Sequence, residues 1–527
     1  MIRLAIALVA LLGLQPPAAA MAQTLRMGVQ APFVLDPHYL FLGPNMAAAR
    51  HIFDSLVGRD ADSRWVPSLA ERWRQLDDTT WEFTLRRGVS FHDGSPFTAA
   101  DVVASFARVP SIPNNPSSYE PNLRTVSSLE APDPHTLIVH TDRPNPTLPG
   151  QFTNIFIIPA RLAREPAEAA GTRVAVGTGP YRLTSFRYGE GMTLRRNETY
   201  WGDKPAYADV TVRVISNDAS REAALLASDI DLMENLPPDD VAKLGANPAT
   251  AVFSRAADRV VFLLPNVGAD RLPLLTARNG KPLDANPMRD LRVRQAISAA
   301  IDRPALVQRV LSGQGVPTMQ IVPEGFAGWT AALPVPKPDP AAARRLLADA
   351  GYPDGFGLSI GCTNDRYIYD GRVCQVLAQM LNRAGLSATV ETMPGSMFMA
   401  RTRIGKNDLP LVLYAISLSS LRDVAYILAI AHTADDANGF VGGRGGFSDP
   451  ELDRIIEAAI IRSGPEREAA VQHAHREAIA RLGLIPLYDE PTIAAARAGI
   501  TYAPRMDQQM VAMGARPAAA ANGEAKR

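Results

Sequence analysis

Strand and helix patterns alternate along the second half of this chain, and this alternation restricts its fold more than any other feature. Apolar residues recur at every second position over residues 356–360 and 386–390, as in half-buried strands. Between them, residues 373–381 carry apolar side chains at helical spacing, and residues 409–416 form a continuous apolar strand. This order predicts a parallel sheet covered by helices, which binds ligands at the carboxyl ends of its strands. The loops after the first and last of these strands are therefore expected to lie in a cleft.

Residues 81–106 predict a strand, a tight turn and a capped helix. Apolar and polar side chains alternate in the first residues of this segment, and Asp93-Gly94 supplies turn chemistry. Thr98 stands three residues before Asp101, which is the spacing of an N-cap and a first-turn acid. The segment offers no catalytic apparatus, so it indicates architecture rather than chemistry.

The first 22 residues have the pattern of a secretory signal peptide. Arg3 provides the positive start, residues 4–14 are apolar, and Ala20-Met21-Ala22 is a small-residue cleavage pattern. The mature chain is expected to begin at Gln23 and to reside in the periplasm, without a lipid anchor because no Cys follows the signal. No later stretch reaches the roughly 18 uninterrupted apolar residues of a membrane helix.

The remaining chain, of about 500 residues, is too long for one hydrophobic core, so two or three domains are expected. The sequence holds 54 basic and 54 acidic residues, a balance that argues against a nucleic-acid partner. Cys362 and Cys374 are the only cysteines. In an oxidising compartment they could form one disulfide or remain two buried free thiols, and the sequence leaves both possibilities open.

A family resemblance rests on six stretches that follow one another in a familiar order. These are residues 67–73 (Pro-Ser-Leu-Ala-Glu-Arg-Trp), 81–106, 177–183 (Gly-Thr-Gly-Pro-Tyr-Arg-Leu), 196–202 (Arg-Asn-Glu-Thr-Tyr-Trp-Gly), 293–303 and 346–353 (Leu-Leu-Ala-Asp-Ala-Gly-Tyr-Pro). Together they resemble the periplasmic dipeptide-, oligopeptide- and nickel-binding proteins of ABC transporters, which form the extracellular solute-binding protein family 5. The resemblance covers nearly the whole mature chain.

The resemblance implies an α/β fold, namely a bilobed periplasmic-binding-protein clamp (type II, cluster C) with an extra subdomain and two hinge crossings. The crossings would lie near residues 255–266 and near residue 484. The implied divisions are a signal peptide at 1–22, lobe I at 23–59, 166–258 and 484–515, the extra subdomain at 60–165, lobe II at 259–483, and a disordered tail at 516–527.

The implied function is that of the substrate-binding component of an ABC importer. Such a protein closes two lobes over a small solute, a short peptide in the first place, and delivers it to the membrane permease. We expect it to act as a monomer, without a cofactor or bound metal, and not as an enzyme, since the common catalytic motifs are missing. Two alternatives remain: the same scaffold with a metal chelate, haem, opine or sugar as ligand, and an enzyme with a scattered active site.

Family members bind the two ends of a peptide through charge pairs, and two residues resemble these anchors by motif position. Asp423 would bind the amine and Arg366 the carboxylate. Ala425 departs from the pattern, because many members have a second acid there, and Asp423 could instead cap the following helix. Arg366 could instead be a solvated loop residue paired with Asp365. Three aromatic residues could enclose the ligand or fill the core: Tyr39, Phe41 and Tyr414.

Overall fold

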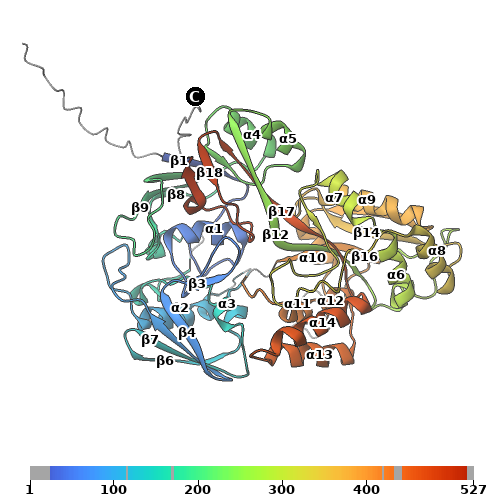
Figure 1. The fold of residues 1–527 in the computed structure, drawn as a ribbon, viewed down its shortest axis with the longest axis horizontal. Helices are drawn as coiled ribbons and strands as arrows, with labels where there is room; N and C mark the ends of the chain where they lie inside the picture. The colour runs from blue at the N-terminus through green and yellow to red at the C-terminus, as the bar shows by residue number, and fades with distance from the viewer. Residues whose placement is uncertain are drawn as a thin grey trace, which may run out of the picture.

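The computed structural model describes residues 24–113, 115, 117–167, 171–417, 420–432 and 442–518. The predicted signal peptide lies outside these residues. Figure 1 shows two lobes joined by the long strands β12 (Thr250–Pro265) and β17 (Ile485–Arg497). None of the described helices is long and apolar enough to cross a membrane.

A mixed sheet of 11 strands runs through both lobes (Figure 1). Its order is β15 (Ser387–Met393), β14 (Gly357–Thr363), β16 (Leu411–Ser417), β12, β17, β11 (Leu232–Met233), β1 (Thr24–Val29), β10 (Asp209–Val214), β9 (Gly191–Arg196) and β8 (Tyr181–Arg187), with β13 (Val316–Pro317) paired to β17. We call the part around β14 to β16 lobe II and the part around β1 and β8 to β11 lobe I. β14 pairs in parallel with both β15 and β16, which confirms the parallel arrangement predicted here.

Strands β12 and β17 connect the lobes as one antiparallel pair. Their pairing is irregular between Ala256 and Val260, where β12 carries extra residues relative to β17. The two lobes are therefore parts of a single hydrogen-bonded sheet that is interrupted near its middle.

Helices cover both faces of the sheet in lobe II, because successive strand residues point to opposite sides. Along β12, Val261 and Leu263 enter one apolar core, whereas Phe262 and Leu264 enter another. The first core is completed by α6 (Leu291–Ala300), α7 (Arg303–Val310), α8 (Pro340–Asp349) and α9 (Asp370–Arg383). The second is completed by α10 (Gly395–Arg401), α11 (Val424–His432), α13 (Pro450–Ile461) and α14 (Arg467–Arg481), with the short α12 (Gly442–Gly445) beside α11.

Lobe I places α1 (Gly43–Ile52) in one core, and α4 (Asp218–Leu226) and α5 (Val241–Gly245) in another. The pair β18 (Ile500–Tyr502) and β19 (Ala515–Pro517) packs against the first of these cores. β19 includes Arg516 and Pro517, which the sequence assigned to a disordered tail. Backbone pairing with β18 gives these two residues a fixed place, and the tail after residue 518 lies outside the described chain.

The extra subdomain has its own sheet in the order β4 (Ala70–Asp77), β5 (Thr80–Leu85), β7 (Thr136–Thr141) and β6 (Val126–Asp133). Helices α2 (Ala99–Arg108) and α3 (Leu148–Gln151) share its aromatic-rich core, and the pair β2 (Val57–Arg59) and β3 (Trp65–Pro67) lies beside it. At the start of α2, the Asp101 carboxylate accepts the backbone N–H of Thr98 at 2.8 Å, within a capping box. The strand and capped helix predicted for residues 81–106 are confirmed.

Candidate functional site

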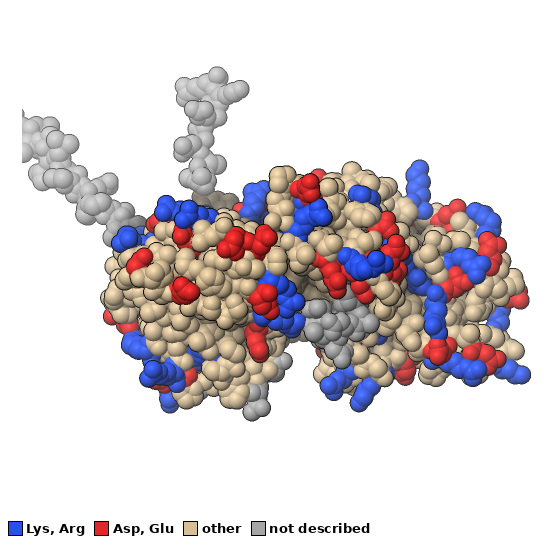
Figure 2. Space-filling model, turned by 90° about the horizontal axis from the view of Figure 1, so that it is seen from below, with Lys and Arg blue, Asp and Glu red and all other residues tan. Residues whose placement is uncertain are grey.

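A cleft of about 1070 Å³ lies between the extra subdomain and lobe II. Figure 2 shows the molecule recessed between its two halves. This volume is slightly above the range of about 300–1,000 Å³ that is usual for small-ligand sites. The extra subdomain contributes a wall of amides and hydroxyls, including Asn122, Thr125, Asn145, Thr147, Gln151 and Asn154. The facing wall includes the loops after β14 and β16, so the position of the cleft agrees with the sequence prediction.

Positive charge dominates the lining of the cleft. Among the described residues that line it are five arginines, namely Arg124, Arg143, Arg259, Arg366 and Arg467, and two carboxylates, those of Asp453 and Glu457. Arg143 contacts the neighbouring Asp142 at the surface, and Arg467 is bound inside lobe II. An excess of guanidinium groups in a partly enclosed site favours a ligand with one or more carboxylates.

Arg366 lies in the cleft, as the sequence predicted, in the loop after β14. Its guanidinium carbon lies 5.6 Å from the ring centre of Tyr367 and 5.9 Å from that of Tyr414. The alternative pairing with Asp365 is absent from the described residues, and the Asp365 carboxylate accepts the backbone N–H of Gly395 at 2.8 Å. Within the described chain, the Arg366 guanidinium has aromatic contacts but no carboxylate partner, so its N–H donors can reach a ligand.

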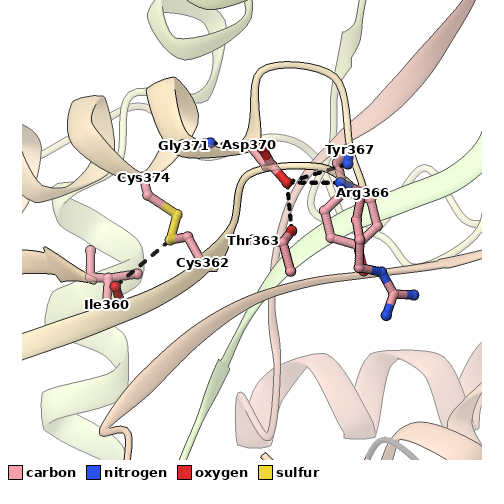
Figure 3. The surroundings of a disulfide bond; sticks show 8 residues. All are labelled: Ile360, Cys362, Thr363, Arg366, Tyr367, Asp370, Gly371 and Cys374. Atoms are coloured by element: carbon pink, nitrogen blue, oxygen red, sulfur yellow. Dashed lines mark hydrogen bonds between the residues drawn. A yellow bond between two sulfur atoms is a disulfide. The ribbon is translucent and has the colours of Figure 1, made fainter. Parts of the chain in front are cut away.

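A disulfide and a carboxylate hold the loop that carries Arg366. Cys362 in β14 and Cys374 in α9 are joined, with their Cα atoms 6.7 Å apart, which decides between the two possibilities that the sequence left open. The Asp370 carboxylate accepts the Thr363 hydroxyl at 2.5 Å and the backbone N–H of Arg366 at 3.2 Å. Figure 3 shows the Arg366 side chain pointing away from both the disulfide and Asp370. The loop is thus fixed from inside lobe II while its guanidinium faces outward.

Asp423 does not line the cleft, although the sequence predicts it as an amine anchor. One carboxylate oxygen accepts the backbone N–H of Ala425 at 2.8 Å, as expected of a helix cap. The other accepts two N–H groups of Arg467, at 2.5 and 3.1 Å. Burial raises the pKa of Asp423, and the positive charge of Arg467 opposes this rise. A ligand amine would have to replace Arg467, so the amine-anchor role stays a prediction.

The three predicted aromatic residues differ in position. Phe41 lines the cleft and packs against Tyr119, with ring centres 4.8 Å apart. Tyr414 also lines the cleft, where burial raises the pKa of its phenol, and its hydroxyl donates to the sulfur of Met399 at 4.0 Å. Tyr39 is half-buried and is not among the residues that line the cleft. The structure therefore brings Arg366, Phe41 and Tyr414 to one cavity.

Sequence reasoning missed Arg259, which lines the cleft from β12. Its guanidinium donates to the carboxylate of Glu490 in β17 at 3.1 Å. A signal was available, because Asp258 and Arg259 directly precede the apolar run at residues 260–265, within the predicted crossing. The amide-rich wall of the extra subdomain had no comparable signal, since its residues are scattered over turns.

The chain is similar to known solute-binding proteins. Residues 64–438 match the model of bacterial extracellular solute-binding proteins, family 5 (middle). The glutathione-binding protein GsiB of Salmonella choleraesuis (strain SC-B67) is 30% identical over 367 residues, which are 68% of this chain and 67% of that protein. The GsiB protein of Shigella boydii serotype 4 (strain Sb227) is 29% identical over the same shares of the two chains.

Solved structures share the fold. The periplasmic binding protein DppA from Helicobacter pylori, in complex with the peptide STSA, has a TM-score of 0.75 at 21% identity and covers 94% of this chain and 98% of its own. A dipeptide-binding protein from Pseudoalteromonas sp. SM9913, in complex with Met-Leu, has a TM-score of 0.73 at 20% identity, with 94% and 100% covered. The bilobed α/β clamp predicted from the sequence is confirmed.

These similarities confirm the predicted class of protein. The family consists of solute-binding proteins of ABC transporters, which are binders rather than enzymes and act outside the cytoplasm, in agreement with the predicted periplasmic location. The cleft, its arginines and the two-lobed sheet are the parts that such a role requires. The chain belongs to the bacterial extracellular solute-binding proteins of family 5.

Proposed function

We propose that this protein binds short peptides with a free C-terminal carboxylate, reduced glutathione among them, and delivers them as a monomer to an ABC permease. The observation that carries this proposal is the Arg366 guanidinium, which lies in a large cleft without a carboxylate partner in the described chain. The arginine-rich lining and the similarity to glutathione-binding proteins support a small anionic peptide.

The mechanism follows from the two walls of the cleft. The peptide backbone would bind to the amides of the extra subdomain, and its carboxylate would bind to Arg366 in lobe II. Charge-assisted hydrogen bonds of this kind are strong where water is excluded. Only a ligand that contacts both walls binds the closed form better than the open form, so only such a ligand shifts the equilibrium towards closure.

Calorimetric titration of the purified mature protein with reduced glutathione and with tri-alanine tests the proposal. We expect micromolar or tighter binding of at least one of these peptides, and an Arg366→Gln variant should bind it at least about tenfold more weakly. Native mass spectrometry of the protein as purified identifies any ligand that it retains. If neither peptide binds at millimolar concentration, or if the retained ligand is a metal chelate, haem, opine or sugar, the peptide assignment is wrong.

A further inference from the structure

Glu490 occupies a central position beneath the cleft. It lies on β17, one of the two strands that cross between the lobes, and its side chain is only 1% exposed. One carboxylate oxygen accepts the backbone N–H of Ile368 at 2.9 Å, in the same loop as Arg366. The other accepts Arg259 at 3.1 Å and the side-chain amide of Gln508 at 3.0 Å. This carboxylate thus joins the ligand loop of lobe II, both crossing strands and the C-terminal segment of lobe I.

Arg259 on β12 and Arg366 in the loop after β14 lie on the same side of the cleft. Both line the cleft beside Tyr367, whose hydroxyl accepts the backbone N–H of Ala415 at 3.2 Å. The guanidinium carbon of Arg366 lies 5.6 Å from the ring centre of Tyr367. The Glu490 carboxylate binds both the Arg259 guanidinium and the backbone N–H of Ile368, the residue after Tyr367, and so holds Arg259 next to this loop. The two arginines therefore form a pair of cations on one wall of the cleft.

Most donors of the Arg259 guanidinium remain available. A guanidinium carries several N–H donors in a planar fork, and in the described chain only one of those of Arg259 donates to a protein group. Its side chain is 33% exposed and belongs to the lining of the cleft, so a ligand there can reach the guanidinium. Glu490 holds the group in place without covering it.

We infer that Arg259 is a second anchor for the ligand carboxylate beside Arg366, and that Glu490 is the positioning residue that orients it. This inference rests on the proposed function, because it takes a carboxylate-bearing peptide as the ligand. A ligand bound in this way would contact a crossing strand directly, because Arg259 lies on β12 and Glu490, which holds it, lies on β17.

The test compares each free-acid peptide with a form whose C-terminal carboxylate is neutral. The probes are reduced glutathione with its glycyl ethyl ester, and tri-alanine with its C-terminal amide. Calorimetry measures both dissociation constants within each pair. The quantity compared is the dissociation constant of the ester or amide divided by that of the free acid. We expect Arg259→Gln to lower this ratio at least about fivefold and to leave the affinity for the ester or amide within about twofold. Glu490→Gln keeps the shape but removes the charge, and should lower the ratio about threefold.

Two further variants separate binding from folding. The double variant Arg259→Gln/Glu490→Gln leaves no unpaired buried charge, so it should fold and still show the reduced ratio. The matched control is Arg497→Gln, on the same strand as Glu490 but paired with Asp231 at 2.9 Å in lobe I, and its ratio should equal that of the wild type. The inference is overturned if Arg366→Gln lowers the ratio while Arg259→Gln and the double variant do not. If the wild type binds none of the probes, the proposed function itself is wrong and the inference falls with it.

Discussion

The indole N–H of Trp65 donates a hydrogen bond to the backbone carbonyl of Ser420 at 2.7 Å. Trp65 is the first residue of β3, beside the extra subdomain, and Ser420 precedes α11 in lobe II, so this bond joins the two sides of the cleft. Arg422 adds a second bond across the same gap, to the backbone carbonyl of Asp62. Ser420 also lines the cleft, and this bridge between the two walls therefore lies directly beside the ligand site.

Trp65→Phe should weaken ligand binding without unfolding the protein. The substitution keeps an aromatic ring but removes one hydrogen bond between the walls, which is worth about 1 kcal/mol and stabilises the closed arrangement. We expect the dissociation constant to rise about fivefold in calorimetry, and small-angle X-ray scattering should show a larger radius of gyration for the ligand-free variant. Trp81→Phe is the matched control, because the buried indole N–H of Trp81 has no partner in the described chain. Equal affinities of the Trp65→Phe variant and the wild type would show that this hydrogen bond does not contribute to closure.

Asp423→Asn should lower the free energy of unfolding by about 3 kcal/mol, because it leaves the largely buried Arg467 without its counter-charge. Asparagine is still a good helix cap, so the bond to Ala425 can persist. Urea denaturation measures this loss. Calorimetry with tri-alanine and N-acetyl-tri-alanine then separates the two roles of Asp423. A loss of affinity confined to the free-amine peptide would establish the amine anchor that the sequence predicts, whereas equal losses would leave only the structural role.

Removal of the disulfide should loosen the ligand loop. The double variant Cys362→Ala/Cys374→Ala is expected to be about 3 kcal/mol less stable in urea denaturation. Hydrogen exchange at residues 364–369 should become faster, since only the hydrogen bonds of Asp370 and Glu490 would then hold the loop. Affinity for a carboxylate-bearing peptide should fall. Both sulfur-bearing residues are fully buried, so reductant should act on the folded wild type only slowly. Unchanged exchange and affinity in the double variant would show that the hydrogen bonds of Asp370 and Glu490 are enough to hold the loop.

The acids at the crossing strands should make stability depend on pH. Burial raises the pKa of Asp489 to about 8, and the nearby negative charge of Asp258 adds to the rise. A carboxyl whose pKa is higher in the folded than in the unfolded chain holds its proton better when folded. Its stabilising effect is therefore present at low pH and is lost as pH rises from about 4 to about 8. Asp489→Asn should remove this loss, so its Tm should exceed that of the wild type by at least about 2 °C near pH 9 and by less near pH 5. A difference in Tm that is the same at both pH values would contradict the assignment.

The features of this structure that could be predicted from the sequence are those that depend on residues close together in the chain. The alternation at residues 356–360 and the spacing from Thr98 to Asp101 each depend on neighbours a few residues away, so periodicity and capping rules found them. Arg366 was found through its place after a strand in a recognised motif. The partner of Asp423 was out of reach, because Arg467 lies 44 residues further along the chain and only the packing of α11 against α14 brings the two together.

The sheet that joins the lobes was also beyond local rules. β12 and β17 are separated by more than two hundred residues, and the pattern of apolar residues in one strand does not identify the other as its partner. The same holds for Glu490, whose partners come from three distant segments. Long-range pairing of this kind is decided by the whole fold. The sequence indicates it only through a charged residue within an apolar strand, because a buried charge needs a partner.

The interruption of the β12–β17 pairing between Ala256 and Val260 has a mechanical consequence. A closing movement has to bend a continuous sheet, and the bend concentrates where ladder hydrogen bonds are missing, immediately beside Arg259. A ligand that contacts Arg259 would therefore act on the segment that bends, while the paired residues on either side of it let each half of the sheet move as a unit.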